Sequence, residues 1–338
     1  MKSQLSPAAD TDPAAIIRLG TAFCQAKAVL TAVELGLFTT LSEAPGTAEE
    51  LTERLGLQPR GTRDFLDLLV SLELLERAGG RYRNAASADH HLVQGKPTYV
   101  GGFLARANHN LYPAWGRLTE ALKTGKPQSE SDFMEMIKEP ARLRRFVGMM
   151  DALTDMLGPR LAQAFDWSTV DSVLDVGGAR GNLASHLARA HPALHASVFD
   201  LPEMRPLFDE NVAGLGLTDR MRFHGGDFFA DALPEAGVVV IGHVLHDWAA
   251  DERRTLVEKA FTAVRPGGAL LVYDRMLDNP PTDLDNLVIS LDMLLTTPGG
   301  EEYPVDECVA VLESVGFTGV VAKPLGSHDT LVIGYKPA

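Results

Sequence analysis

The sequence predicts an α/β fold in which a mostly helical N-terminal region precedes a doubly wound parallel sheet. Two observations lead to this prediction. Apolar positions recur at helical spacing through the first part of the chain, and from about residue 172 onward short apolar runs alternate with helical stretches. Such alternation is typical of a parallel sheet whose ligands bind at the carboxyl ends of its strands. With 338 residues, the chain is long enough for two domains.

The N-terminal region is predicted to be helical and to end in a hairpin. Apolar residues recur at helical spacing over Ala14–Leu37, and Thr47–Glu50 has the pattern of a capping box that opens a helix running to Leu55. A second helix is expected over Arg60–Glu73, and Ala78–Gly80 separates two short strands. Helix, turn, helix and hairpin in this order are typical of a winged-helix domain.

A winged-helix pattern raises the alternative of a DNA-binding regulator. The helix that would read the groove sets Arg60 and Arg63 against three acids, Asp64, Asp67 and Glu73. A groove-reading helix normally carries positive charge and hydrogen-bond donors. The formal charge of −14 also argues against nucleic-acid and anionic-membrane partners. DNA binding is therefore the disfavoured role for this region.

The later part of the chain divides into a helical segment and a sheet. Helices are predicted again from Gly101 to about Trp167, with many methionine and aromatic positions. The strands expected after them are Ser172–Val176, His195–Asp200, Val238–Ile241, Ala269–Tyr273 and a last one at Leu331–Tyr335, with helices such as Asn182–Ala190 and Asp251–Val264 between them.

Composition favours a soluble cytoplasmic protein. The two cysteines, Cys24 and Cys308, lie in apolar helical-looking segments, so no disulfide framework is expected. Met1–Pro13 is polar and lacks the apolar core of a signal peptide. No run of 18 uninterrupted apolar residues occurs, so no membrane span is expected.

A glycine-rich turn and a strand-end acid indicate a nucleotide-type site. Asp175–Gly181 follows a predicted strand and opens a helix, and glycines there let a ligand approach the backbone closely. The dehydrogenase spacing Gly-x-Gly-x-x-Gly is not met. Asp200 ends the next strand, where a carboxylate can accept hydrogen bonds from both hydroxyls of a ribose. The alternative for Asp200 is a solvated acid at a strand end.

Two further motifs, Gly226–Phe229 and His246–Trp248, follow in order. Together the four resemble those of the metal-independent, S-adenosylmethionine-dependent small-molecule O-methyltransferases, of the plant caffeic-acid type and its bacterial natural-product relatives. The resemblance covers most of the chain. It implies a Rossmann-like class I methyltransferase sheet whose last strand is antiparallel, preceded by a winged-helix-like dimerisation domain, and hence a homodimer.

The resemblance also divides the chain by role. Residues 1–100 would form the dimerisation domain, residues 101–166 a helical bridging segment that lines the substrate pocket, and residues 167–338 the domain that binds S-adenosylmethionine. The cofactor contacts it implies are Asp175, Gly177 and Gly178 in the turn, Asp200 and Leu201 at the ribose, Gly226, Asp227 and Phe228 at the adenine, and Gly242 with His243 at the end of the third predicted strand.

Three positions depart from the family pattern at the cofactor site. Ala179 and Arg180 replace a third glycine and a small hydroxyl residue, and Arg180 either pairs with the cofactor carboxylate or lies on the surface. Gly242 stands where the plant enzymes have a lysine that helps to hold the cofactor, so recognition of the carboxylate must differ here. His243 is left open as a pocket residue or a bystander.

The catalytic residues implied are His246, Asp274 and Glu302. A phenol has an ordinary pKa of about 10, so a histidine with a pKa of about 6.5 is a workable base only if a carboxylate stabilises its cation. His246 would be that base, and the two acids would orient it. The family's lysine and arginine around the second acid are Glu301 and Tyr303 here, and the aspartate replaces a usual glutamate, so the ring would have to lie closer.

The sequence thus predicts a metal-independent O-methyltransferase acting on a phenolic hydroxyl of a small aromatic substrate. The residues that the resemblance places against the substrate are Phe146, Met150 and Leu153 on the bridging helix, and Met293 and Thr297 on the opposite wall. A core face is the alternative for the first three. The alternative functions are an N- or C-methyltransferase, or a non-methylating enzyme of the same fold.

Overall fold

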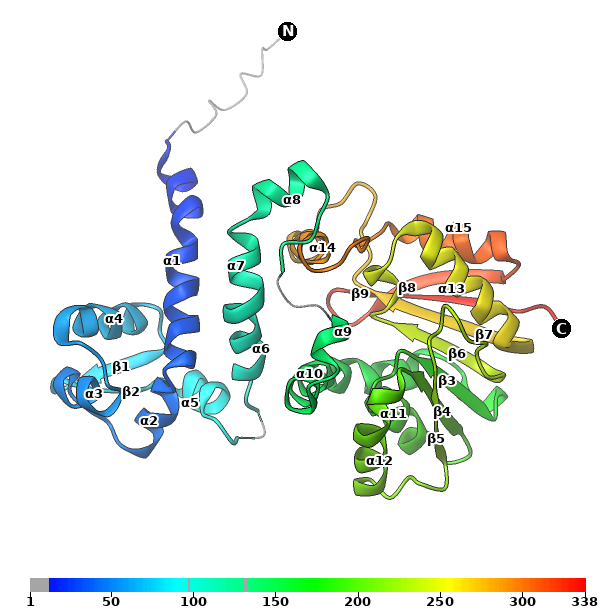
Figure 1. The fold of residues 1–338 in the computed structure, drawn as a ribbon, viewed down its shortest axis with the longest axis horizontal. Helices are drawn as coiled ribbons and strands as arrows, with labels where there is room; N and C mark the ends of the chain where they lie inside the picture. The colour runs from blue at the N-terminus through cyan, green and yellow to red at the C-terminus, as the bar shows by residue number, and fades with distance from the viewer. Residues whose placement is uncertain (1–11, 97, 130–132) are drawn as a thin grey trace, which may run out of the picture. The chain divides into compact units, whose positions relative to one another are not determined.

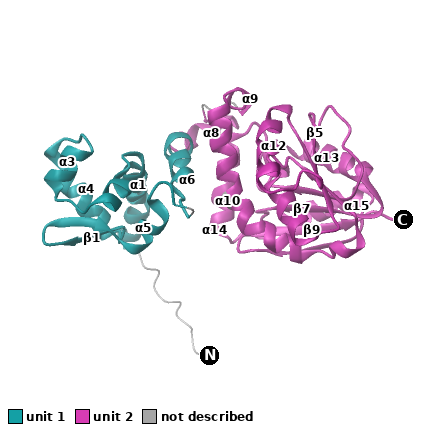
Figure 2. Ribbon diagram, turned by 90° about the horizontal axis from the view of Figure 1, so that it is seen from below, with its two compact units in different colours: residues 1–112 teal, residues 113–338 magenta. Residues whose placement is uncertain are grey.

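The computed structural model describes residues 12–96, 98–129 and 133–338. The chain forms two compact units, residues 1–112 and residues 113–338 (Figure 2). The first unit contains α1 (Ala14–Glu34), α2 (Leu37–Glu43), α3 (Ala48–Arg54), α4 (Pro59–Ser71), β1 (Leu75–Ala78), β2 (Arg81–Asn84), α5 (Ala86–Leu92), α6 (Gly101–Arg106) and the π-helical turn η1 (Ala107–Leu111).

The first unit contains the predicted helices and hairpin in the predicted order, with α2 and α5 in addition. Thr47 and Glu50 form the expected capping box at the start of α3, with hydrogen bonds of 3.2 and 3.1 Å. The strands β1 and β2 pair antiparallel around Gly79 and Gly80, whose positive φ angles suit a tight hairpin turn. The expected single helix Ala14–Leu37 is wrong in one respect: it ends at Glu34, and α2 begins after a left-handed glycine.

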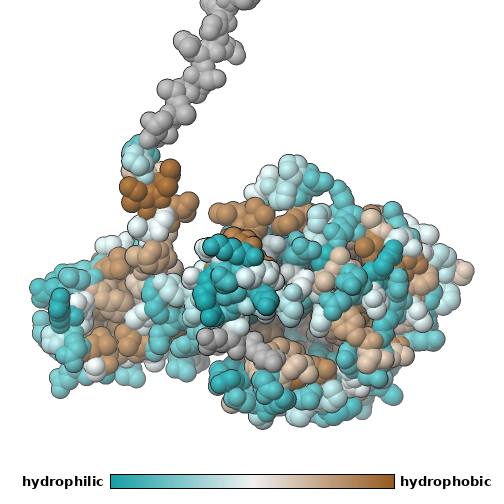
Figure 3. Space-filling model, turned by 45° about the horizontal axis from the view of Figure 1, so that its top comes forward, coloured by the Kyte–Doolittle hydropathy of each residue, from teal (hydrophilic) through white to brown (hydrophobic). Residues whose placement is uncertain are grey.

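Helix α1 exposes apolar side chains along its first half, including Ile16, Leu19 and Phe23 (Figure 3). Only 17% of its most apolar 18-residue window is buried. By length and composition alone, α1 is also apolar enough to cross a membrane. This is weak evidence for a membrane span, because the core helix of a soluble protein or a signal sequence passes the same test.

The second unit is built on a seven-stranded sheet of order β5-β4-β3-β6-β7-β9-β8. Its strands are β3 (Ser172–Val176), β4 (His195–Asp200), β5 (Met221–Gly225), β6 (Ala236–Gly242), β7 (Val264–Asp274), β8 (Thr318–Leu325) and β9 (Asp329–Tyr335). The first five pair in parallel, whereas β9 runs antiparallel to β7, as the resemblance implied. The strands β5 and β8 had not been predicted.

Helices cover both faces of this sheet (Figure 1). One face packs against α10 (Pro140–Ala164), α11 (Asn182–Ala190) and α12 (Arg205–Gly214), and the other against α13 (Ala250–Ala263) and α15 (Val305–Val315). Successive residues of β6 alternate between the two cores, Val238 and Val240 on one side and Val239 and Ile241 on the other. A strand buried on both faces is apolar throughout, which places its first polar residues at the strand end.

The remaining helices of the second unit lie outside these two layers. They are α8 (Leu118–Thr124), α9 (Phe133–Met136) and α14 (Leu284–Thr296), while α7 (Tyr112–Trp115) spans the boundary between the units. Leu295 of α14 is fully buried against Ala114 and Ala121. Helix α14 leads directly into the loop that carries Glu302, so its packing positions that loop.

Candidate active site

The turn between β3 and α11 uses backbone conformations that favour glycine. Gly177 and Gly181 have φ angles of +74° and +78°, and Ala179 between them is also left-handed at +47°. A Cβ atom on Gly178 would lie 2.4 Å from Oδ2 of Asp175, so the turn passes tightly over this buried carboxylate. The turn therefore offers bare backbone at the carboxyl edge of the sheet, where a ligand can approach closely.

Asp200 ends β4, and the backbone of the same turn holds it. Its Oδ2 accepts a hydrogen bond from the N–H of Ala179 and its Oδ1 one from the N–H of Leu201, both at 2.7 Å. Burial raises the pKa of Asp200 to about 6, although the two N–H donors lower it. Burial, and then the charge of Asp200, raises the pKa of Asp175 to about 7. At neutral pH, Asp200 is therefore ionised to a greater extent than Asp175. The oxygens of Asp200 also retain lone pairs that can accept hydrogen bonds from two hydroxyl groups.

The motif Gly226–Phe229 lies beside Asp200 because β5 pairs with β4. The N–H of Gly226 donates to the carbonyl oxygen of Asp200 at 3.0 Å. Asp227 is exposed, and Phe228 is half-buried with its ring edge-on to those of Phe229 and Trp248. The glycine turn, the strand-end carboxylate and this aromatic side chain suit the nucleoside part of a ligand such as S-adenosylmethionine.

Gly242 is the last residue of β6, on the other side of β3, and His243 follows it. A Cβ atom on Gly242 would lie 2.0 Å from Cζ of the buried Tyr273 ring. That ring thus fills the space into which a lysine at position 242 would extend. His243 has a left-handed φ of +52°, and its Nε2 lies 3.0 Å from Oδ1 of Asp329. The His243 ring therefore lies against a carboxylate of β9, a contact that does not by itself give the ring a role toward a ligand.

His246 lies in a short 3₁₀ turn, Leu245–Asp247, just after β6, and is 8% exposed. Its Nδ1 donates a hydrogen bond to Oε1 of Glu302 at 2.7 Å. The same nitrogen lies 3.8 Å from Oδ1 of Asp274, which is beyond hydrogen-bond distance. The structure thus brings the three predicted catalytic residues together. It leaves Nε2 of His246 as the nitrogen that can accept a proton.

The expected division of labour between the two acids is wrong in one respect. Glu302 orients the imidazole, whereas Asp274 acts on it through charge alone, because its Oδ1 lies 3.8 Å from Nδ1 of the ring. The other oxygen of Asp274, Oδ2, accepts a 2.6 Å hydrogen bond from the hydroxyl of Tyr303. The hydrogen bond from Tyr303 therefore holds the shorter aspartate, and the imidazole ring of His246 does not lie closer to it. Sequence reasoning noted Tyr303 only as a departure from the family. The feature that could have identified Tyr303 is its place next to a candidate catalytic acid, since a buried tyrosine hydroxyl needs a hydrogen-bond partner.

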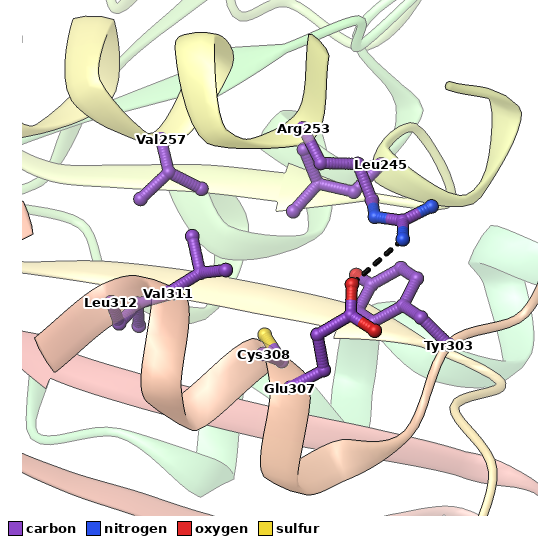
Figure 4. A pocket seen from close by; sticks show the side chains of 8 residues that line it. All are labelled: Leu245, Arg253, Val257, Tyr303, Glu307, Cys308, Val311 and Leu312. Atoms are coloured by element: carbon purple, nitrogen blue, oxygen red, sulfur yellow. Dashed lines mark hydrogen bonds and ion pairs between the residues drawn. The ribbon is translucent and has the colours of Figure 1, made fainter. Parts of the chain in front are cut away.

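A small cavity lies behind Tyr303 (Figure 4). The guanidinium of Arg253 lies over the Tyr303 ring at 4.6 Å and pairs with Glu307 at 2.7 Å. Leu245 and side chains from α13 and α15 form the rest of the wall. Because neither His246 nor the two acids line this cavity, it is not itself the chemical site.

The pKa of His246 is strongly perturbed. Burial alone would lower it, but the negative charges of Asp274, Asp247 and Glu302 together outweigh burial and raise the pKa to about 10. Burial also raises the pKa of Asp274, while the neighbouring imidazolium lowers it. The free protein therefore holds His246 mainly as an imidazolium at neutral pH. A conjugate acid with this pKa matches the ordinary pKa of a phenol.

The loop that carries Glu302 is fastened to the backbone of His246. The N–H of Glu301 donates to the carbonyl oxygen of His246 at 2.9 Å, and a Cβ atom on Gly300 would lie 2.5 Å from that oxygen. The hydroxyl of Thr297 accepts from the N–H of Gly300 and donates to the carbonyl oxygen of Met293, both at 2.8 Å. Because the single hydroxyl hydrogen is used within the loop, Thr297 has no donor left for a substrate.

The other predicted substrate residues share one face of α10. Phe146, Met150 and Leu153 are spaced by four and three positions, which places them along one side of a helix, and each is half-buried. The ring of Phe146 packs edge-on against Phe133 at 5.7 Å. Half-buried side chains suit the wall of a pocket, and the substrate role of these residues stays a prediction.

His243, His246 and Asp274 also place one ligand atom each within 4.8 Å of one another, close enough to hold a metal ion. The sequence had predicted a metal-independent enzyme. The fold creates this cluster by bringing the ends of β6 and β7 together.

Two family models match the chain. The O-methyltransferase domain matches residues 115–318, and the O-methyltransferase dimerisation domain matches residues 17–94. The tetracenomycin polyketide synthesis 8-O-methyl transferase of Streptomyces glaucescens is 49% identical over 329 residues, which are 96% of this chain and 97% of that protein. An N,N-dimethyltransferase of Streptomyces rimosus is 41% identical over 330 residues, 95% of this chain and 96% of that protein.

Solved structures agree with these matches. Human N-acetylserotonin methyltransferase, crystallised in complex with S-adenosylmethionine, is 28% identical with a TM-score of 0.86, covering 99% of this chain and 100% of that chain. The mitomycin 7-O-methyltransferase structure has the same identity and TM-score over 96% of this chain and 97% of that chain. The chain therefore belongs to the O-methyltransferase family that uses S-adenosylmethionine as its cofactor.

Proposed function

We propose that this enzyme methylates a phenolic hydroxyl of a small aromatic, polyketide-type substrate, without a metal and with His246 as the general base. The observation that carries the proposal is the buried 2.7 Å hydrogen bond from Nδ1 of His246 to Glu302. This bond fixes the ring at the same sheet edge as the glycine turn and Asp200. The relatives named above for polyketide and mitomycin O-methylation support the substrate class.

The protein's part in the reaction is to align the acceptor and remove its proton. S-adenosylmethionine, when bound, supplies an electrophilic methyl group on a sulfonium. Nε2 of His246 takes the hydroxyl proton, the hydrogen bond to Glu302 keeps the ring in place, and the charge of Asp274 stabilises the imidazolium that forms. Such a base contributes about 10²–10⁴-fold. Alignment contributes up to roughly 7–11 kcal/mol in favourable cases.

The predicted contacts are part of the same proposal. The cofactor would lie against Asp175, Gly177, Gly178, Asp200, Leu201, Gly226, Asp227, Phe228, Gly242 and His243, and the substrate against Phe146, Met150, Leu153, Met293 and Thr297. Residues 1–100 would serve dimerisation, residues 101–166 would line the substrate pocket and residues 167–338 would bind the cofactor. We place the enzyme in the cytoplasm.

Methyl transfer to nitrogen is the second candidate, because the relative that is 41% identical is named an N,N-dimethyltransferase. A neutral amine already carries a lone pair and needs no base before attack. A phenol with a pKa of about 10 does need one. The ion-paired His246 therefore favours oxygen as the acceptor.

Acceptor specificity can be tested with methyl-labelled S-adenosylmethionine and matched pairs of aromatic phenols and amines, including naphthols and hydroxyanthraquinones. We expect the label on phenolic oxygen, identified by mass and by the position of the new methyl group. Label found only on nitrogen or carbon would contradict the proposal and favour the second candidate.

Replacing His246 with alanine should lower kcat by about 10²–10⁴-fold while S-adenosylhomocysteine affinity changes by less than about twofold, because the base acts on the acceptor. His246→Gln should be almost as slow, since an amide cannot take the proton. His195→Ala, at the exposed start of β4, is the matched control and should keep parental turnover. Near-parental activity of folded His246→Ala would refute the general-base role. Loss of parental activity with a chelator would refute metal independence.

The pH profile should reflect the raised pKa of His246. Only neutral imidazole can accept the proton, so kcat/KM should rise about tenfold per pH unit from pH 7 toward the pKa of about 10. Asp274→Asn removes a negative charge that favours the imidazolium, so the midpoint should move to lower pH. Ionisation of the free substrate would not shift in that variant. A flat profile between pH 7 and 9, or an unshifted midpoint, would show that His246 does not control the rate.

The apolar face of α1 supports a homodimer. Ile16, Leu19 and Phe23 are 76%, 79% and 57% exposed, and the dimerisation domain matches residues 17–94, which include most of this helix. Exposed apolar area of this kind favours burial against another surface. A second copy of this chain is the partner that the match to a dimerisation domain favours.

The parent should therefore be a dimer by light scattering at micromolar concentration, and Leu19→Glu with Phe23→Glu should convert it to a monomer. Leu215→Glu is the control, because Leu215 is an exposed apolar residue of the second unit. A monomeric parent would contradict the homodimer. Co-sedimentation of the parent with lipid vesicles would instead assign the face to a membrane.

A further inference from the structure

The sequence left two roles open for Arg180, contact with the cofactor carboxylate or a place on the surface. In the structure, Arg180 forms an ion pair within the second unit. Its Nη2 lies 2.5 Å from Oδ2 of Asp151 on α10. The Asp151 side chain is 10% exposed and that of Arg180 is 34% exposed. The Nε of Arg180 is buried and has no hydrogen-bond partner among the residues that the structure describes. The glycine turn thus carries a cation with an unused donor, next to a nearly buried anion.

The position of Asp151 is fixed by contacts between α10 and α11. Nδ2 of Asn182, the first residue of α11, donates to Oδ1 of Asp155 at 2.9 Å and approaches the carbonyl oxygen of Asp151 at 3.5 Å. Nε2 of His186 also pairs with Asp155 at 2.9 Å. Asp151 lies one helical turn before Asp155, so its carboxylate stands at the amino end of α11, where the glycine turn enters that helix.

The rest of the cofactor site accounts for only part of the ligand. Asp200 suits the ribose and Phe228 suits the adenine. The amino-acid end carries an α-ammonium and an α-carboxylate and needs one anion and one cation. The lysine of the plant enzymes is absent, and the ring of Tyr273 occupies the space beside Gly242. Arg180 and Asp151 are an oppositely charged pair next to the bare backbone of the turn.

We propose that Arg180 binds the α-carboxylate and Asp151 the α-ammonium of the methionine part of S-adenosylmethionine. The inference rests on the cofactor placement proposed above. Arg180 can use its free Nε–H together with a second N–H for a two-point contact with a carboxylate. Burial raises the pKa of Asp151 to about 6 even beside Arg180, so a second cation at this carboxylate would favour its ionised form.

Calorimetric titration with two ligands separates this role from a structural one. S-adenosylhomocysteine carries the amino-acid end, whereas 5′-methylthioadenosine shares its nucleoside but lacks that end. Arg180→Ala should weaken S-adenosylhomocysteine binding by about tenfold or more and leave 5′-methylthioadenosine within about twofold. Asp151→Asn should give the same pattern. Arg180→Lys keeps the charge and should lose less.

Two control variants locate the effect. Asp200→Ala should weaken both ligands, because both contain the ribose. Arg144→Ala should weaken neither, since Arg144 is also on α10 but pairs with Glu210 at the exposed surface. Equal weakening of both ligands by Arg180→Ala would show a structural role, and unchanged S-adenosylhomocysteine binding would show no role. Either result overturns the proposal. The binding arms do not involve His246 or the acceptor, so they can fail while the proposed function stands.

The α-methyl ester of S-adenosylhomocysteine gives a second measurement that does not depend on how well a variant folds. Its carboxylate charge is absent, so the parent should bind the ester about tenfold more weakly than the acid. The same comparison in Arg180→Lys should show a smaller difference, because the partner of the carboxylate is altered. Equal affinity of the parent for acid and ester would overturn the assignment of the carboxylate to Arg180.

Discussion

Four polar side chains that are almost inaccessible to water interact with one another at the end of β6, through two hydrogen bonds and one charge contact, and the geometry of the site depends on this network. The imidazole of His246 balances Glu302 and Asp274, and the hydroxyl of Tyr303 donates to the second acid. Buried charges are tolerated only when paired and hydrogen-bonded. The ends of β6 and β7 and the loop between α14 and α15 must therefore meet in one arrangement. The acids that must be paired in this arrangement also raise the pKa of His246.

Acidic groups also surround the cofactor turn. Asp175, Asp200 and Asp151 are all at least partly buried near it, and burial raises the pKa of each. Arg180 is the cation that the turn itself contributes. A ligand with a sulfonium and an ammonium group brings positive charge to carboxylates that lack enough partners of their own. The local excess of acid is thus complementary to the family's cofactor, and it accords with the acidic balance of the whole chain.

Some elements of the fold could be predicted from the sequence because their signals lie within short segments of the chain. The bounds of β3, β4 and α11 agree with the predictions, since a strand buried on both faces is an apolar run and the glycine turn marks where it ends. The strand β5 begins with an alternating run that a half-polar loop could equally contain, and β8 is an edge strand, mostly exposed and containing a proline. Neither carries a continuous apolar signal, so both were missed.

The sequence by itself determined the layers, the strand-end positions of Asp200 and Asp274, and the candidate base. It did so because strand period, turn chemistry and motif order are properties of short segments. Which acid holds His246 was decided only by the tertiary structure, as were the hydroxyl of Tyr303 on Asp274 and the partner of Arg180. These contacts join residues far apart in the chain. Their distances depend on how loops and helices pack against the sheet edge, which residue spacing does not encode.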